Sequence, residues 1–326
     1  MSIESAQVKQ QAIALGFHKV GIVSINTVSE AEQQAVSRLN AWLDQGYQAD
    51  MAWMANPRRQ DLRQVLPSVR SIICVALNYY AEVDTVPGRH DRPDGEEYAK
   101  ISRYGWGRDY HRILTKKLKA FGQWLEAQAD GVEARYYADT GPIQEKFWAQ
   151  QAGIGWIAKN SNVITREFGS WVFLGEVLTN LELTPDGPHT EHCGTCTRCI
   201  EACPTGAITE PFVVDANRCI AYHTIENRAE SLPDAIAPHM QGWVAGCDIC
   251  QDVCPWNQRF AKPTNESDFQ PYPWNVAPTL AELAEISDEA IDRRFPASAL
   301  RRIKPDMLRR NAQANLSASE RFKQDD

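Results

Sequence analysis

The chain has 326 residues, of which 43% are hydrophobic and 23% charged, with a formal net charge of −8. These values are ordinary for a globular protein and argue against a disordered or fibrous chain. No apolar run reaches the roughly 18 residues that a membrane-spanning helix needs, and the polar N-terminus is unlike a secretory signal peptide. We therefore expect a cytoplasmic protein without a membrane segment.

Hydrophobic patterning predicts helices and strands that alternate over more than half of the chain. Helices are expected at 3–15, 31–43, 110–127 and 143–151, and strands at 19–25, 71–77, 134–137 and 171–179. The continuous apolar run at 71–77 is typical of a buried central strand, so Cys74 within it is interpreted as a core residue. The segment 83–97, rich in Pro, Gly and Asp, is predicted to be a loop. The pattern indicates an α+β fold in which helices flank a mixed sheet.

The rest of the chain is organised differently. A turn-rich linker at 183–192 precedes a cysteine-rich stretch, and a Pro-rich extended segment follows at 263–278. Thr279 and Glu282 form a capping-box pattern that begins a helix, and a basic helical stretch begins at about Pro305. We expect three parts, with boundaries at 1–182, 183–260 and 261–326.

Eight of the nine cysteines lie between Cys193 and Cys254. Disulfides are disfavoured because a cytosolic compartment keeps thiols reduced, and bunched cysteines are typical of metal ligands. The first run has the spacing of bacterial ferredoxins, in which the fourth cysteine binds the other of two 4Fe–4S clusters. That run is Cys193-x2-Cys196-x2-Cys199-x3-Cys203-Pro204.

A second run also ends in Cys-Pro, and Cys219 lies 28 residues upstream of it. In the ferredoxin pattern, the last cysteine of each run binds the cluster of the other run. Applying this rule divides the eight cysteines into two sets of four. A structural zinc site is the alternative, but it needs only four ligands and does not explain two Cys-Pro endings. The first predicted set is Cys193, Cys196, Cys199 and Cys254, and the second is Cys219, Cys247, Cys250 and Cys203.

Positive charge is concentrated in two stretches despite the negative total. Residues 293–323 contain nine Lys or Arg and two acids, and residues 100–119 contain seven Lys or Arg and one acid. A phosphate backbone responds to such local basic surfaces rather than to the net charge. The alternative is that both stretches are solvated helix faces.

Several motifs accompany the ferredoxin pattern, and together they are specific. They are Tyr104–His111 (YGWGRDYH), Asp139–Pro142 (DTGP), Gly153–Asn160 (GIGWIAKN) and Ala202–Ala207 (ACPTGA). In these motifs, the chain resembles the epoxyqueuosine reductases, which are cobalamin-dependent iron–sulfur enzymes of queuosine biosynthesis in tRNA. The resemblance extends from about Gly16 to Pro255. The resemblance implies a cobalamin-binding catalytic domain, a two-cluster ferredoxin domain and a short helical C-terminal tail.

The resemblance also implies roles for individual residues. Asp139 matches the general acid of the family, and a carboxyl partly shielded from water is expected to titrate upward; the alternative is that it caps its turn. His111 matches a histidine near the cobalamin, although a lone histidine on a helix usually faces solvent. Small residues in 153–160 allow a ring to approach the backbone closely, or else form a tight turn. The other implied cofactor contacts are Arg59, Ser102, Lys159, Asn160 and Asp248.

The implied reaction is the reduction of epoxyqueuosine to queuosine in the anticodon loop of tRNA, the last step of queuosine biosynthesis. Its cofactors are expected to be two 4Fe–4S clusters and base-off cobalamin without a protein ligand to cobalt. Electrons are expected to enter at the second cluster from a donor such as flavodoxin or ferredoxin and to pass to the first, next to cobalt. Asp139 is expected to donate a proton, and the enzyme is expected to be a monomer.

Two other functions fit parts of the sequence. One is a corrinoid reductase acting on a small molecule, similar to reductive dehalogenases, which typically carry an export signal. The other is a non-enzymatic electron carrier, which does not need the large domain before the cysteines. The basic stretches favour the tRNA enzyme. About 70 residues follow Pro255, and Arg309–Ala312 looks like the start of a truncated helical-repeat extension. We therefore expect tRNA binding by the C-terminal segment to be reduced or arranged differently.

Overall fold

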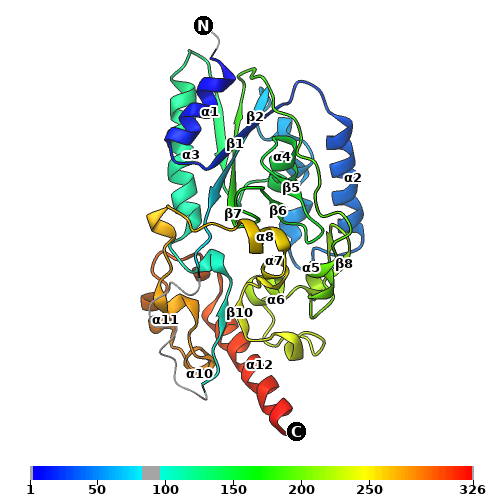
Figure 1. The fold of residues 1–326 in the computed structure, drawn as a ribbon, viewed down its shortest axis with the longest axis vertical. Coiled ribbons are helices and arrows are strands. Elements are labelled where there is room, and N and C mark those ends of the chain that lie inside the picture. Colours follow the sequence, from blue (N-terminus) through cyan, green and yellow to red (C-terminus); the bar gives the residue numbers. More distant parts are fainter. Residues whose placement is uncertain (1–2, 83–95, 325–326) are drawn as a thin grey trace.

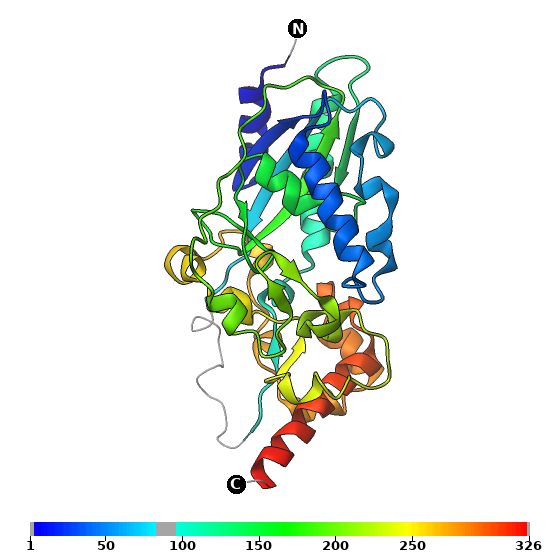
Figure 2. The same ribbon diagram turned by 90° about the vertical axis from the view of Figure 1, so that its right-hand side faces the viewer.

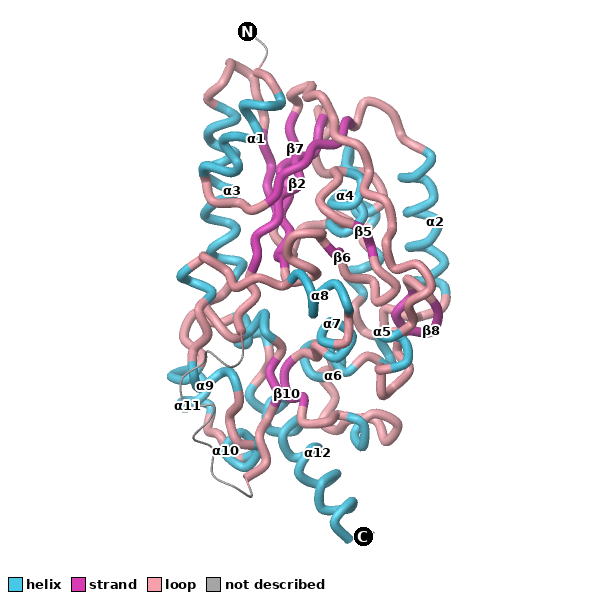
Figure 3. Tube along the Cα trace, viewed as in Figure 1, coloured by secondary structure: helices cyan, strands magenta, loops and turns pink. Residues whose placement is uncertain are grey.

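The computed structural model describes residues 3–82 and 96–324, so most of the predicted loop at 83–97 lies outside the described residues. A helix-flanked sheet is followed by a region of short helices and strands (Figures 1 and 3). No helix in these two ranges is both long and apolar enough to cross a membrane. The first region contains α1 (Ser5–Ala14), β1 (Lys19–Ser24), α2 (Glu30–Asp44), β2 (Ser71–Asn78), β3 (Lys100–Ile101), α3 (Tyr110–Glu126), β4 (Ala134–Tyr137), α4 (Glu145–Gln151), β5 (Trp156–Ile157), β6 (Val163–Ile164) and β7 (Val172–Thr179).

The second region contains α5 (Arg198–Glu201), β8 (Ile208–Glu210), β9 (Val213–Val214), α6 (Ile220–Ile225), β10 (Trp243–Ala245), α7 (Ile249–Asp252), α8 (Pro255–Phe260), α9 (Pro273–Val276), α10 (Leu280–Ala284), α11 (Asp288–Arg294) and α12 (Pro305–Gln324). All eight helices and strands predicted from the first 180 residues are present, with ends within two residues of those observed. The α+β class is therefore confirmed.

Four strands form the main sheet in the order β1–β2–β7–β4. Each pairing in this sheet is antiparallel, so the prediction of a mixed sheet is wrong for it. The parallel pairing that the described residues contain joins β10 to β3 in a separate two-stranded sheet. Periodicity does not distinguish the two directions here, because the central strand β2 is buried on both faces.

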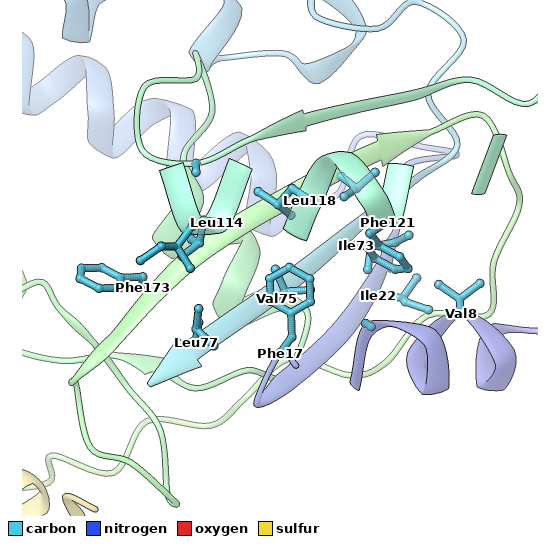
Figure 4. Close-up of a cluster of buried hydrophobic side chains, with 14 of the residues drawn as sticks. Val8, Phe17, Ile22, Ile73, Val75, Leu77, Leu114, Leu118, Phe121 and Phe173 are labelled. Carbon is cyan, nitrogen blue, oxygen red and sulfur yellow. The ribbon is translucent and has the colours of Figure 1, made fainter. Parts of the chain in front are cut away.

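Helices cover both faces of the main sheet. Alternate residues of β2 point to opposite faces, and Ile73, Val75 and Leu77 pack against α1 and α3, as Figure 4 shows. Ile72, Cys74 and Ala76 belong to the other core, beneath α2 and α4. Cys74 is fully buried there, as predicted.

The C-terminal segment packs against both earlier parts of the chain. One hydrophobic core joins Ile101 and Trp106 of the first region, Val244 of the second and side chains of α10–α12. Packing therefore crosses the boundaries predicted at 182/183 and 260/261. In Figure 2, α12 extends from this end of the molecule, opposite the N-terminus.

Thr279 is the N-cap of α10, since its hydroxyl accepts the backbone N–H of Glu282 at 3.2 Å, while the Glu282 carboxylate pairs with Arg294. The helix that Thr279 begins is shorter than expected and ends at Ala284, and Ser287 caps a separate helix, α11. Two N-capping residues eight positions apart explain the division into two helices.

Arg309 and Arg310 do not form the free basic surface that the sequence indicated. Arg309 makes ion pairs with Asp288 and Asp306. Arg310 is 8% exposed and donates hydrogen bonds to the carbonyls of His223 (2.7 Å), Asn227 (3.0 Å) and Ala229. Its guanidinium thus ties α12 to the turn after α6.

Replacing Arg310 with Ala should lower the free energy of unfolding by about 3 kcal/mol, because buried carbonyls lose their donor. The Arg309→Ala control should change it by less, because Arg309 donates to one carbonyl, that of Ile286, and its ion-pair partners Asp288 and Asp306 are mostly exposed. Urea denaturation followed by circular dichroism measures both, and equal shifts would contradict the structural role of Arg310.

Candidate active site

Asp139 lies in the turn between β4 and α4, with a positive φ of 61°. Asp tolerates this left-handed conformation better than most residues. Its backbone N–H donates to Glu145 Oε1 at 2.6 Å. Arg59, predicted as a cofactor contact, donates instead to the carbonyls of Gly141 (3.1 Å) and Ile143 (2.9 Å). The turn is therefore held from both sides by side chains, and a direct contact between Arg59 and a corrin stays a prediction.

His111 lies between two carboxylates. Its Nδ1 is 2.8 Å from Asp109 Oδ1, and its Nε2 is 3.0 Å from Asp139 Oδ2. Asp109 also accepts the backbone N–H of His111 as the N-cap of α3. The imidazole stacks on Tyr110 at 4.0 Å, and Tyr110 stacks on Phe173 of β7 at 4.1 Å. These contacts fix the ring where the first turn of α3 meets the Asp139 turn.

Electrostatics assign the proton of this pair to His111. Burial lowers the pKa of His111, but hydrogen bonds to Asp109 and Asp139 outweigh it and raise the pKa to about 9. Burial raises the pKa of Asp139, but the hydrogen bond and charge of His111 hold it below its ordinary value. The expectation that Asp139 titrates upward is therefore wrong, because the cationic imidazole of His111 outweighs the effect of burial.

The eight cysteines of the second region divide by proximity into two groups. Electrostatic interactions link Cys196, Cys199 and Cys254, and Cys193 packs with Cys254. A second group, Cys203, Cys219, Cys247 and Cys250, interacts in the same way, and Cys250 also interacts with Cys199 of the first group. These groups coincide with the predicted sets, although ligation itself stays a prediction. Among the described residues, no three His, Cys, Asp or Glu side chains are placed to hold a single metal ion.

The surroundings of Cys193 fit a sulfur-rich cluster. The fully buried indole N–H of Trp156 has no hydrogen-bond partner of normal geometry among the described residues. Burial raises the pKa of Cys193 to about 11, and the Lys159 backbone and the nearby Trp156 indole N–H oppose that rise. A spare donor beside a ligating thiolate is what iron–sulfur sites use to tune their potential.

Lys159 and Asn160, predicted as cofactor contacts, brace the cysteine loops. Lys159 Nζ donates to the carbonyls of Gly194 (2.6 Å) and Cys196 (3.1 Å). Asn160 Nδ2 donates to the carbonyl of Cys250 at 3.1 Å. The two side chains therefore touch one predicted cluster loop each, and their contact with a corrin stays a prediction.

The glycines before them serve protein packing rather than an open cofactor face. A Cβ on Gly155 would lie 2.2 Å from the carbonyl oxygen of Ile164, in the strand paired with β5. Gly153 has a φ of 73° after the end of α4. Gly153 and Gly155 therefore fit the alternative interpretation, in which this motif forms a tight turn.

Ser102 and Asp248 join the first region to the cysteine-rich region. Ser102 Oγ donates to Asp248 Oδ1 at 2.6 Å, and the Arg103 backbone N–H donates to Asp248 Oδ2 at 2.8 Å. Ser102 is 4% exposed and Asp248 is 1% exposed. Because their side-chain oxygens are engaged within the protein, a direct contact with a corrin stays a prediction for both.

Lys146 connects the Asp139 turn with one cysteine group. Its side chain is solvent-exposed, and Nζ donates to the Ser161 carbonyl at 2.8 Å. Burial among protein atoms lowers its pKa, while charges on Glu145, Cys250, Asp139 and Cys219 act on it from two sides. Lys146 is therefore within electrostatic range of both the candidate proton donor and the second cysteine group.

The sequence interpretation missed four residues of this site: Glu145, Lys146, Glu176 and Arg302. Glu145 and Lys146 follow the DTGP motif directly. Glu176 interrupts an otherwise apolar strand, a signal that was available because isolated charges are rarely buried without a reason. The charge of Arg302 reaches Asp139 from the C-terminal segment, a proximity that no local pattern reveals.

The imidazole of His111 should carry both ring protons at neutral pH and titrate with a midpoint near 9, above its ordinary 6.5. Because the folded-state pKa is raised, stabilisation by this ion pair is complete below pH 6.5 and is lost as pH rises through 9. Histidine ¹⁵N NMR measures the midpoint, with His111→Gln as the assignment control. A midpoint at or below 6.5 would contradict the ion pair.

Two family models match the chain. One, described as "Epoxyqueuosine reductase QueG, DUF1730", matches residues 59–140, which include the Asp139 and His111 positions. The other, a 4Fe-4S double cluster binding domain, matches residues 192–257 and includes all eight clustered cysteines. The second match establishes that the chain binds two 4Fe–4S clusters.

Full-length relatives and solved structures agree with these matches. The epoxyqueuosine reductase of Synechocystis sp. is 63% identical over 90% of this chain and all of its own length, and that of Gloeobacter violaceus is 52% identical over 98% of each. A crystal structure of epoxyqueuosine reductase with an epoxyqueuosine-modified tRNA-Tyr stem loop has a TM-score of 0.86 at 30% identity, covering 96% of this chain and 80% of that one.

The Bacillus subtilis enzyme, described with its catalytic aspartate loop swung out of the active site, also has a TM-score of 0.86. It is 29% identical and covers 98% of this chain and 84% of its own. Identity of 63% over most of the chain, together with both family matches, decides the assignment. The chain therefore belongs to the epoxyqueuosine reductase family and is an oxidoreductase of queuosine biosynthesis.

Proposed function

We propose that this chain reduces epoxyqueuosine to queuosine in tRNA, with the His111–Asp139 pair as its proton source. The observation that carries the proposal is the placement of this pair, 3.0 Å between Nε2 and Oδ2, beside Lys146 and the second cysteine group. Proton and electron supply thereby meet at one site. A dehalogenase-like reductase or a plain electron carrier does not account for the family relationship.

The reaction removes the epoxide oxygen as water and consumes two electrons and two protons. The departing oxygen is strongly basic, so a positioned acid lowers the barrier. His111 holds one proton between two carboxylates. Asp139, with a side chain 55% exposed, passes it to the substrate oxygen and is supplied again from His111 or solvent.

We propose cobalamin as the electron-transferring cofactor beside these groups. When bound, it supplies a strongly reducing centre for breaking a carbon–oxygen bond. His111, Asp139 and Lys146 are the polar side chains that would face it. Both ring nitrogens of His111 are engaged by carboxylates, which supports a base-off cofactor held without a protein ligand to cobalt.

We propose a direction of electron flow opposite to the one expected from sequence. Charges of the second cysteine group, from Cys219 and Cys250, act on Lys146, and Asp248 of that loop acts on Tyr104, as does Asp139. Cys193 in the first group is affected by Glu191 instead. We therefore propose that electrons from flavodoxin or ferredoxin enter at the first cluster and leave from the second.

Arg302 replaces Arg309 and Arg310 as the proposed contact with the tRNA backbone near the site. It forms a two-point ion pair with Glu226 at 2.6 and 2.8 Å, and its side chain is 50% exposed. Two of its five N–H donors are used in that pair, so the others are available to a phosphate.

The direct test incubates the reduced, cluster-loaded protein and cobalamin with tRNA that contains epoxyqueuosine. Queuosine should appear by nucleoside mass spectrometry and should require cobalamin. Unchanged epoxyqueuosine after complete cluster reduction would contradict the proposal.

Asp139→Asn should lower turnover by about 10²-fold or more, since it removes the carboxylate that shares the proton of His111. Cobalamin affinity should change little. Asp130→Asn, an exposed turn residue before β4, is the matched control. Turnover by Asp139→Asn at the control's rate would remove Asp139 from the reaction.

Arg302→Gln should weaken tRNA binding several-fold at low salt and reduce the salt dependence of affinity by about one phosphate contact. Arg301→Gln is the control, because Arg301 pairs with Asp292 and both are more than half exposed. Filter binding over a salt series compares them, and identical slopes would exclude Arg302 as a phosphate contact.

A further inference from the structure

Glu176 is a fully buried acid in the central strand β7. Neither carboxyl oxygen has a hydrogen-bond partner of normal geometry among the described residues. Its register partners are Cys74 on β2 and Tyr137 on β4, and both belong to the core beneath α4. Directly opposed residues point to the same face, so Glu176 points into that core. An unpaired ionised carboxylate there would cost several kcal/mol, so Glu176 is protonated.

Glu145, at the start of α4, is the acidic neighbour of Glu176, because α4 packs against β7. Burial and then the charge of Glu145 raise the pKa of Glu176 well above its ordinary value. Burial and then the charge of Asp139 raise the pKa of Glu145 to about 7. Two carboxyls in contact do not both ionise readily, so the pair retains one proton above pH 7.

The pair reaches the active site through the backbone. Glu145 Oε1 accepts the Asp139 N–H at 2.6 Å, six residues away across the turn. An ionised carboxylate accepts a backbone N–H more strongly than a neutral carboxyl does. The charge on Glu145 therefore affects how firmly the turn presents Asp139.

We propose that Glu145 and Glu176 share one proton and serve as positioning residues, with ionised Glu145 holding the Asp139 turn and the Glu176 hydroxyl stabilising that charge. This inference rests on the proposed function, in which Asp139 acts on the substrate. A buried pair of acids is not expected to be kept for stability alone, because replacing such a pair with apolar side chains usually does not lower the free energy of unfolding.

Other ionisable groups face the pair from each packed element. Arg59, Lys146 and Asp139 act on Glu145, while the buried Cys74 thiol and the Tyr137 ring adjoin Glu176 across the sheet. The cations favour the ionised form of Glu145 and Asp139 opposes it. The midpoint of about 7 for Glu145 includes these charges, so turnover should rise as pH increases through that value.

Infrared spectroscopy tests the shared proton in the cluster-loaded protein without substrate. At about pH 8, the carbonyl stretch of a protonated carboxyl should be present, and Glu176→Gln should remove it. The amide of Gln can donate an N–H to Glu145 in place of the hydroxyl, so hydrogen exchange in the 138–145 segment should stay close to that of the unmodified protein. Absence of the band in the unmodified protein, or its persistence in Glu176→Gln, would overturn the proposal.

Hydrogen exchange tests the hold on the turn independently of Glu176. Glu145→Ala should accelerate exchange in the 138–145 segment and lower kcat about tenfold or more, with the tRNA KM nearly unchanged. Glu145→Gln keeps an acceptor oxygen without charge, so it should retain part of the activity and lose the rise in turnover near pH 7. Glu133→Gln, at the other end of β4, is the control.

Unchanged exchange in Glu145→Ala, or a pH rise retained in Glu145→Gln, would also overturn the positioning role. If the infrared band and the hydrogen exchange behave as expected but the protein never forms queuosine, the proposed function is refuted. The shared proton of Glu145 and Glu176 would still stand. The two failures are therefore distinguishable.

Discussion

The ion pair between His111 and Asp139 is the contact on which the candidate site depends. It joins the first turn of α3 to the turn after β4, two segments 28 residues apart in sequence. Asp109 holds the other face of the imidazole, and Arg59 and Glu145 hold the backbone of the Asp139 turn. In the proposed function, this fixed geometry would present Asp139 to the substrate oxygen in a productive orientation.

Charge at the site is arranged in alternating signs from the sheet outward. The buried Glu176 is neutral, Glu145 is ionised above pH 7, and His111 is cationic between two carboxylates. Lys146 lies between this array and the second cysteine group. Because each charge has an opposite neighbour, the site keeps several ionisable groups together at a tolerable electrostatic cost.

Local signals in the sequence were enough to predict most of the architecture. The apolar run at 71–77 identified the central strand, and cysteine spacing predicted two groups that the fold brings together. Strand direction and the roles of Arg310 and Ser102 were not predictable, because they depend on contacts between distant segments. The pKa of Asp139 was misjudged for the same reason, since His111 reverses the effect of burial. Glu176 could have been noticed as an acid in an apolar strand.

The pH dependence of single-turnover queuosine formation by the pre-reduced protein tests most directly where the proton resides. If His111 supplies it, the rate should fall at high pH with a midpoint near 9, the pKa that its two carboxylate partners produce. A rate that already falls below pH 6.5 as pH rises would mean that a group of lower pKa, Asp139 itself, carries the proton, and would contradict this account.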